Sequence, residues 1–353
     1  MEFNYKQLTF AREYRKYSQT ELASRIPGLS QSNLSKFEKG LDTLSNDLIE
    51  KIIDFLDFPK EFFQQHIPSM VENAEYRRRA TITKGDRLDI EYSIRFISHL
   101  IDQMSNAIEW PDLKLKAIDI EDGFSPVSIA KLIRKQFKLK NGEPVKNIFS
   151  IIEQSGIIIY ELDANEKFDG VSFQTENGFP LIIVNSNFSN DRKRFTLAHE
   201  LGHLVMHVLT ENPISEYRNK EKEADQFASE FLMPEDGIRN SLLNLKLSYL
   251  ADLKSYWLTS MGAIIRKAKD LHCISADKYK YLNIELSRRG WKKNEPVHVF
   301  IDSPKLFSVG YKLHKNDLEY SDEELSKAFR VPTDVVKRYY NLPRGESKLR
   351  VVI

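Results

Sequence analysis

The stretch FTLAHELGHLVMH, residues 195–207, holds the side chains whose types and spacing could do chemistry. His199 and His203 are four positions apart, so in a helix they lie one above the other on the same face. Two imidazole nitrogens arranged in this way can both reach one Zn²⁺ ion at about 2.0–2.1 Å. Glu200 is displaced by one residue and cannot be a third ligand, but it can reach a metal-bound water and act as general base. The alternative interpretation is a buried helix with two structural histidines and a salt-bridged glutamate.

A zinc site of this kind needs a third protein ligand, and we expect it on the next amphipathic helix, NKEKEADQFASEFLMP, residues 219–234. The buried stripe of that helix is Ala224, Phe227, Ala228 and Phe231. Glu221 lies on the border of this stripe and is the expected ligand, whereas Glu223 projects toward the opposite border. Asp225, one turn further along, can accept the second ring N–H of a ligand histidine. The alternative is a surface helix whose acidic run is merely solvated. A nitrogen-rich ligand set favours Zn²⁺ over manganese.

The segments before these helices predict the elements that position them. Residues 125–139 and 143–156 read as amphipathic helices that begin near a proline. Residues 156–162, 170–175 and 179–185 are β-branched and aromatic, and the Glu176-Asn177-Gly178 turn predicts a hairpin. We therefore expect a small antiparallel sheet, followed by the HELGH helix capped by Asn190 or Asp191, in an α+β domain. The strand GVSFQT is the expected exposed edge, to which a peptide could add as an extra strand. His207 and Tyr217 are candidates for an oxyanion partner by nearness in sequence only.

Residues 1–66 predict several short helices. Ser18 and Ser30 stand at capping positions, and the second helix presents Gln31, Ser32 and Asn33 outward. Such a helix-turn-helix can enter a major groove, where Gln and Asn pair with adenine edges. Phosphate contacts are expected from Gln19, Lys36 and Lys39. A small helical bundle for dimerisation or protein docking is the alternative, because the charges of this segment are nearly balanced.

Composition sets the broad class of the protein. The 353 residues are 41% hydrophobic and 29% charged with a net charge of +1, which is typical of a globular chain of two or three domains. Cys273 is the single cysteine, so a disulfide framework and a cysteine-rich zinc site are excluded. The N-terminus lacks an apolar signal core, and no apolar run reaches the roughly 20 residues of a membrane span. We expect a soluble, cytoplasmic protein that has no membrane partner.

The remaining segments have no catalytic spacing. Residues 73–87 read as a basic connector, and Leu88 to Trp110 as one long helix with an apolar stripe, of the kind that spaces or dimerises domains. A homodimer is therefore among the expected assemblies. Further on, 253–271 reads as a packed helix and 297–301 as a strand. Residues 321–340 read as two helices broken at Val331-Pro332, either a degenerate second helix-turn-helix or a helical interaction module.

Two stretches resemble known families. SQTELA, LSQSNLSKFEKG and LIEKIIDFLDFP are similar to the Xre/Cro-repressor helix-turn-helix domains, over residues 1–66. GVSFQTENGFPLIIVN, HELGH and EKEADQFASEFLMP resemble the ImmA/IrrE zinc metallopeptidases, from about Lys116 to Glu235. The resemblance implies the gluzincin-like ligand set His199, His203 and Glu221, with Glu200 as base, and a repressor cleaved after stress or prophage induction.

The sequence thus predicts a multidomain, mainly α protein with an α+β zincin-like core. The expected domains are 1–66 (helix-turn-helix), 67–115 (linker and long helix), 116–245 (zinc metallopeptidase) and 246–353 (mostly helical, regulatory or interaction). The expected function is that of a DNA-binding regulator with a zinc endopeptidase that cleaves a helix-turn-helix repressor or antitoxin. Two alternatives are a non-catalytic regulator that uses the zincin fold as sensor or docking surface, and a component of a toxin–antitoxin or immunity pair.

Overall fold

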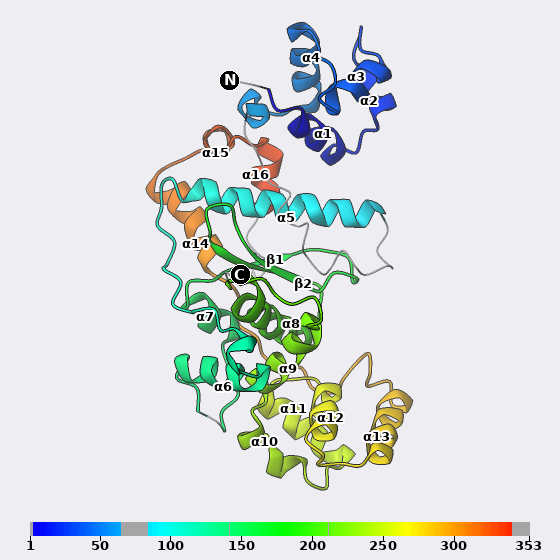
Figure 1. Ribbon diagram of the computed structural model, residues 1–353, viewed down its shortest axis with the longest axis vertical. Helices are drawn as coiled ribbons and strands as arrows, with labels where there is room; N and C mark the ends of the chain where they lie inside the picture. Colours follow the sequence, from blue (N-terminus) through cyan, green and yellow to red (C-terminus); the bar gives the residue numbers. More distant parts are fainter. Residues whose placement is uncertain (1–2, 65–83, 141, 211, 341–353) are drawn as a thin grey trace, which may run out of the picture.

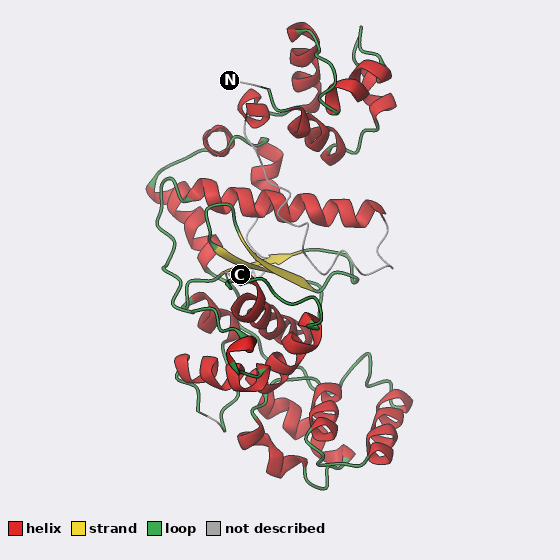
Figure 2. Cartoon of the chain, viewed as in Figure 1, coloured by secondary structure: helices red, strands yellow, loops and turns green. Residues whose placement is uncertain are grey.

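The structure, a computed structural model, describes residues 3–64, 84–140, 142–210 and 212–340. It is mainly helical and has one small sheet near its middle, as expected (Figure 1, Figure 2). Among the described residues, none of the helices combines the length and apolar character needed to span a bilayer.

The N-terminal region is the expected group of short helices. They are α1 (Tyr5–Tyr14), α2 (Gln19–Arg25), α3 (Gln31–Glu38), α4 (Asn46–Leu56) and the 3₁₀ turn η1 (Lys60–Gln64). The side chain of Ser18 accepts the backbone N–H of Glu21 in a full capping box, and Ser30 caps α3 by accepting the N–H of Asn33. Both caps were predicted, and together they fix where α2 and α3 begin.

A long buried helix, α5 (Lys84–Met104), crosses the middle of the molecule. It begins earlier and ends earlier than the predicted 88–110. Its apolar stripe, including Ile94, Ile97 and Ile101, is fully buried inside the chain. Of the two expected roles, spacing domains or dimerising them, this stripe is therefore not available for a dimer interface. Of the connector predicted over 73–87, residues 73–83 lie outside the described residues, and residues 84–87 form the start of α5.

The sheet is mixed, not antiparallel as predicted. The strands are β1 (Ile158–Leu162), β2 (Gly170–Gln174) and β3 (Pro180–Asn185), in the order β1-β3-β2. The predicted hairpin joins β2 to β3, but β1 pairs with β3 in parallel. The reason is that β3, buried along its whole length, takes the centre of the sheet and separates β1 from β2. β2 therefore forms an edge of the sheet, as expected.

Helices cover both faces of the sheet. Ile158, Leu181 and Ile183 face the core that contains α5, whereas Ile159, Ile182 and Val184 face a second core. That second core contains α6 (Pro126–Gln136), α7 (Ile148–Glu153), α8 (Asn190–His203) and α9 (Lys220–Leu232). Figure 1 shows α5 on one side of the strands and α8 on the other. The alternation of strand side chains therefore divides the sheet between two cores.

Two helix starts differ from the prediction. α7 begins at Ile148, after Asn147, because the buried guanidinium of Arg134 binds the carbonyls of Lys140 and Glu143 and holds that segment as a loop. α8 follows Ser189, so neither Asn190 nor Asp191 is its cap. The side chain of Asn190 instead donates to the carbonyl of Val299.

Residues 235–340 are divided between the two cores. α10 (Glu235–Leu242), η6 (Leu247–Tyr249), α11 (Leu250–Trp257), α12 (Met261–Asp270) and α13 (Ala276–Arg288) lie at the far end from α1–α4 (Figure 1). The single helix predicted over 253–271 is wrong, because Leu258 is left-handed (φ 58°) and Ser260 caps a new helix. The predicted strand 297–301 is also absent, since this described segment pairs with no strand.

The chain then returns to α5. α14 (Leu306–Lys312), the π-helical turn η7 (Leu313–Asp317), α15 (Asp322–Phe329) and α16 (Thr333–Tyr340) add their apolar side chains to the core around α5. The helix break at Val331-Pro332 is where the sequence predicts it. α15 and α16 therefore pack against α5 next to the N-terminal helices (Figure 1).

Candidate metal centre

α8 lies between β2 and α9, and a glycine on each side lets it approach closely. A Cβ on Gly170 of β2 would stand 2.7 Å from Cγ2 of Thr196, and a Cβ on Gly202 would stand 2.9 Å from Cδ1 of Phe227 in α9. Both distances are too short for ordinary packing. Because of this close fit, one face of α8 reaches α9 while the neighbouring Glu200 reaches β2.

The facing side chains of α8 and α9 bring three candidate ligand groups together. The Nε2 atoms of His199 and His203 lie 3.0 Å apart. Oε2 of Glu221 lies 3.6 Å from Nε2 of His199, and its Oε1 lies 3.3 Å from Nε2 of His203. Four-coordinate zinc with bonds of about 2.0–2.1 Å separates its ligand atoms by roughly 3.3–3.4 Å. The three distances scatter around this value, so the donor set fits one zinc ion.

The electrostatics of the cluster also favour a cation. Burial lowers the pKa of His199, but its hydrogen bonds to Asp225 and Glu221 and the charge of Glu200 raise it to about 10. The two imidazoles in turn hold the pKa of the Glu221 carboxyl far below its usual value, chiefly through its bond to His199. Three carboxylates therefore surround the imidazole pair, and the cluster attracts positive charge.

Glu200, which follows His199 on α8, faces β2 of the sheet. It is 7% exposed, and one carboxylate oxygen, Oε2, accepts a hydrogen bond of 2.7 Å from Oγ of Ser172 on β2. The other oxygen is left for a further proton donor. Sequence reasoning missed Ser172, because a serine inside a strand pattern carries no signal of which loop or helix it will face.

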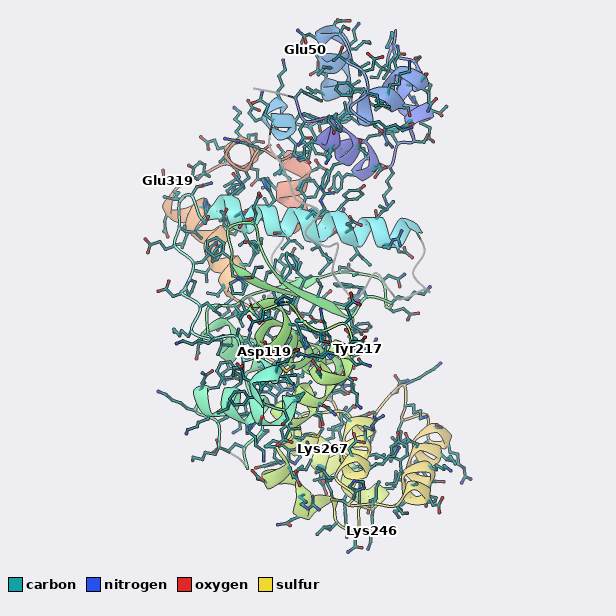
Figure 3. The ribbon with its side chains drawn as sticks, in the orientation of Figure 1. Glu50, Asp119, Tyr217, Lys246, Lys267 and Glu319 are labelled. Carbon is teal, nitrogen blue, oxygen red and sulfur yellow. The ribbon has the colours of Figure 1, made fainter. Side chains whose placement is uncertain are left out.

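Two further candidates, Asp225 of α9 and Tyr217 of the loop before it, have different outcomes. Oδ1 of Asp225 lies 3.0 Å from Nδ1 of His199, on the ring side away from the cluster, where the sequence placed it. The side chain of Tyr217 is 99% exposed, so the structure does not bring it to the cluster (Figure 3). It therefore gives no support to Tyr217 as an oxyanion partner.

His207 lies directly behind the cluster. Its Nδ1 is 3.0 Å from Nδ1 of His203, and its Nε2 is 2.8 Å from Oε2 of Glu223. Arg218 binds both carboxylate oxygens of Glu223. Glu223 is thus turned away from the ligand atoms, as its helix position predicted, and His207 contacts a candidate ligand instead of joining the cluster as a fourth one.

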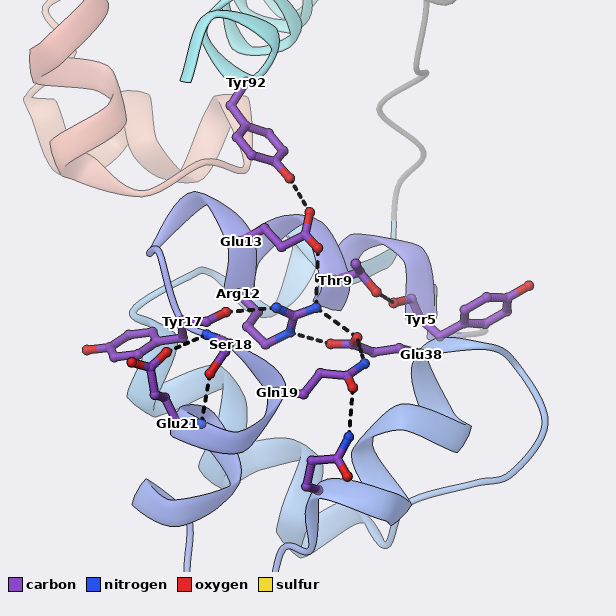
Figure 4. Close-up of polar contacts among 11 residues, drawn as sticks. Tyr5, Thr9, Arg12, Glu13, Tyr17, Ser18, Gln19, Glu21, Glu38 and Tyr92 are labelled. Atoms are coloured by element: carbon purple, nitrogen blue, oxygen red, sulfur yellow. Dashed lines mark hydrogen bonds and ion pairs between the residues drawn. The ribbon is translucent and has the colours of Figure 1, made fainter. Parts of the chain in front are cut away.

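The predicted nucleic-acid interface is a separate surface on α2 and α3. Most of its residues are exposed: Gln31, Ser32, Asn33, Lys36 and Lys39. Gln19 is only partly exposed, since its Nε2 donates to Oε2 of Glu38 at 2.7 Å and its Oε1 accepts from Nε2 of Gln31 at 3.0 Å. Glu38 is in turn paired with the buried guanidinium of Arg12 (Figure 4). An anchored chain of polar groups thus orients the amide of Gln31.

Two regions of the chain match known families. Residues 10–63 match the helix-turn-helix family, and residues 152–269 match a peptidase family described as the IrrE N-terminal-like domain. In this order along the chain, the two regions match an ImmA/IrrE protein with an N-terminal helix-turn-helix, which confirms the resemblance seen in the sequence. The peptidase match continues past Pro234 into α11 and α12.

A more distant relative is also a peptidase by name. An oligoendopeptidase F homologue of Borreliella burgdorferi is 24% identical over 222 residues, which cover 52% of this chain and 37% of that protein. The chain thus spans little more than a third of the length of this relative. The comparisons support a metallopeptidase-type domain and a DNA-binding-type domain in one chain.

Proposed function

We propose that this chain is a DNA-binding regulator whose middle domain is a zinc endopeptidase that cleaves a helix-turn-helix repressor or antitoxin protein. The observation that carries the proposal is the spacing of 3.0, 3.3 and 3.6 Å among the Nε2 and carboxylate atoms of His199, His203 and Glu221, beside a buried glutamate. The peptidase-family match over 152–269 covers this whole arrangement.

His199, His203 and Glu221 would hold the ion, two through nitrogen and one through oxygen, a set that favours zinc over manganese. Zinc, when bound, supplies Lewis acidity that makes water a nucleophile near neutral pH and polarises a peptide carbonyl. Asp225 fixes His199 with its proton on Nδ1, which leaves Nε2 free to bind.

Glu200 is the proposed general base. Its free carboxylate oxygen would take the proton of the attacking water and then pass it to the leaving amine, while Ser172 holds the other oxygen in place. Because the carboxylate is 7% exposed, few water molecules compete for it, and its orientation is fixed before the substrate arrives.

The substrate is proposed to bind along β2. Within the part of the chain that the structure describes, this strand pairs with β3 alone, and it carries Ser172, the partner of Glu200. A peptide that added as a fourth strand would run past Glu200 with its backbone held by the strand, which favours an extended segment of a protein over a folded one.

The N-terminal domain is proposed to bind double-stranded DNA. Gln31, Ser32 and Asn33 would contact base edges at the exposed start of α3, Lys36 and Lys39 would contact phosphates, and Gln19 would hold the Gln31 amide in place. A protein that binds genomic DNA acts in the compartment that contains the genome. We therefore propose that this protein acts in the cytoplasm. The trigger would be a stress or prophage-induction signal, as in regulators that this chain resembles.

The test uses the full-length chain and the repressor or antitoxin encoded beside its gene. Elemental analysis should give one zinc per chain, and His199→Ala should lose it. Glu200→Gln should keep the zinc and slow cleavage of the repressor by about 10²–10⁴-fold. Both variants should still bind DNA, because their substitutions lie far from α3 (Figure 1).

The outcomes separate the alternatives. If Glu200→Gln regulates as the wild type does, and the wild-type chain leaves its neighbour intact while binding it, the zincin fold is a sensor or docking surface and the peptidase proposal fails. A complex of stable stoichiometry without cleavage would identify a toxin–antitoxin or immunity pair.

A further inference from the structure

A line of hydrogen bonds runs from the candidate ligand His203 into the loop that precedes α9. Nδ1 of His203 meets Nδ1 of His207 at 3.0 Å, and Nε2 of His207 meets Oε2 of Glu223 at 2.8 Å. Arg218 donates hydrogen bonds to both carboxylate oxygens of Glu223, at 3.1 and 2.9 Å. Its Nη1 lies 3.4 Å from Oδ1 of Asp119. The line therefore connects three separate segments of the chain.

The proton on each ring follows from the order of these contacts. For Nε2 of His203, which faces Glu221 and His199, to bind a metal, Nδ1 of His203 must carry the ring proton and donate it. Nδ1 of His207 must then accept, which places the proton of His207 on Nε2, where it points at the Glu223 carboxylate. Each donor thus has one acceptor, and His203 is held in the tautomer that can bind a metal.

The same line fixes the first turn of α9. Asn219 caps this helix, and Glu221 and Glu223 both belong to its first turn. Glu221 contacts His199 and His203, while Glu223 contacts His207, which lies one helical turn after His203 in the chain. Two carboxylates from one helical turn therefore contact three histidines that are spaced four residues apart. Of these contacts, only those of Glu221 lie at the proposed metal position.

Burial makes these contacts stronger than surface pairs. The side chains of His207, Glu223, Arg218 and Asp119 are 3%, 16%, 13% and 13% exposed. A charge-assisted, two-pronged contact with this little solvent is well ordered. His207 also lies in a π-helical turn, Leu204–Val208, and such turns occur often at functional sites.

We infer that His207, Glu223 and Arg218 form a brace that sets the His203 ring and the Glu221 carboxylate in place before the metal binds. All three are positioning residues, since none of their atoms is among the ligand atoms. The inference rests on the metal centre of the proposed function, but not on peptide cleavage.

The test measures zinc affinity of the full-length chain by competition with a chromophoric chelator. His207→Leu removes both the acceptor and the donor, and should weaken zinc binding by about 10–100-fold. His207→Gln, whose amide can both accept and donate, should recover part of that loss. Arg218→Met, a milder change at the far end of the brace, should weaken binding at least about threefold. Lys222→Leu is the matched control, because this exposed residue lies between Glu221 and Glu223.

Two further measurements distinguish a brace from general structural support. The double variant His207→Leu/Glu223→Leu should bind zinc about as well as His207→Leu alone, since both substitutions break the same line. Nitrogen chemical shifts of the histidine rings in the zinc-free chain should report the Nδ1-protonated form of His203 in the wild type and a mixture in His207→Leu.

The results that overturn the brace differ from those that overturn the peptidase. Variants that fold and bind zinc within twofold of the wild type, or losses that add up in the double variant, would exclude the brace. If His207→Leu does not fold, an unchanged affinity in Arg218→Met would exclude it equally. A wild-type chain that binds zinc but cleaves nothing overturns the peptidase alone.

Discussion

Arg15, the C-cap residue of α1, and Asp334 of α16 form a two-pronged ion pair, although 319 positions separate them. Nη1 of Arg15 lies 2.7 Å from Oδ2 of Asp334, and Nη2 lies 3.1 Å from Oδ1. The same guanidinium binds the backbone carbonyls of Leu56 and Asp57. The last described helix therefore contacts the helix-turn-helix domain directly.

Apolar packing, and not this ion pair, should hold the helix-turn-helix domain in place. Phe96 of α5 is fully buried, and its ring centroid lies 5.0 Å from that of Phe10 and 4.9 Å from that of Tyr14. Phe96→Ala should lower the free energy of unfolding by about 3–5 kcal/mol and release the domain. Asp334→Ala should cost about 1 kcal/mol or less, because the Asp334 side chain is half exposed.

Small-angle scattering and thermal unfolding check this prediction. Phe96→Ala should increase the radius of gyration, and Phe300→Ala, a control at a 61% exposed ring, should change neither quantity. A larger loss of stability from Asp334→Ala than from Phe96→Ala would show that the ion pair holds the interface.

Gly202→Ala should destabilise the chain, although alanine is the better helix former. In an open helix the exchange stabilises by about 1 kcal/mol. Here the added Cβ would stand 2.9 Å from the ring of the fully buried Phe227, so α9 must move away from α8. We expect a loss of about 1–3 kcal/mol and weaker zinc binding, because Glu221 moves with α9.

Gly262→Ala in α12 is the matched control. The added Cβ would have only Oγ of Ser260 within 4 Å, at 3.9 Å. Chemical denaturation and chelator competition measure both variants. An increase in stability from Gly202→Ala would contradict the close helix contact on which the site geometry depends.

His99 should make the chain less stable in acid. It is buried on α5, where its Nε2 meets the carbonyl of Phe329, and burial lowers its pKa from 6.5 to about 4. The folded chain therefore favours neutral His99, so the stabilisation is complete above pH 6.5 and is lost as the pH falls toward 4. The linked free energy is about 3 kcal/mol.

Denaturant unfolding of the wild type and His99→Gln at pH values from 7.5 to 4 tests this window. The amide of the variant can still donate to Phe329, but it does not titrate, so the stability gap should shift in favour of the variant as the pH falls. His298→Gln, at an exposed histidine, is the control. A constant gap for His99→Gln would show that His99 is not the acid-sensitive group.

Local signals made much of the fold predictable from the sequence. The Ser18 and Ser30 caps, the Asn177-Gly178 hairpin and the break at Pro332 each depend on a few neighbouring residues, and each lies where the sequence predicts it. The face of α9 that carries Glu221 could also be predicted, because helical periodicity fixes which side chains share a border.

Long-range contacts account for the predictions that failed. The parallel pairing of β1 with β3 depends on which strand takes the centre of the sheet, and a single strand pattern does not encode that choice. The loop before α7 exists because Arg134, buried on α6, binds its carbonyls. Ser172 reaches Glu200 because β2 and α8 approach closely at Gly170, and no local sequence pattern predicts that approach.

The polar chain on α2 and α3 gives the last prediction, on DNA recognition. Gln19 holds Gln31 through its Oε1 and is itself held by Glu38, so the Gln31 amide keeps one N–H and its carbonyl oxygen for an adenine edge. Gln19→Ala should therefore reduce the preference for the best operator by about 1–3 kcal/mol per half-site, while binding to unrelated DNA changes little.

Lys36→Ala should have the opposite signature. The exposed ammonium of Lys36 would contact a phosphate, so its loss should weaken binding to all sequences and reduce the slope of log affinity against log salt by about 1. Fluorescence anisotropy with specific and random duplexes over a salt series measures both effects, and Lys51→Ala, whose side chain pairs with Asp47 on α4, is the control. If Gln19→Ala lost affinity equally for both duplexes, Gln19 would be a phosphate contact and not a support for base reading. If neither variant changed DNA binding, the chain would bind DNA through another surface, and the face of α2 and α3 would not be the one that reads the operator.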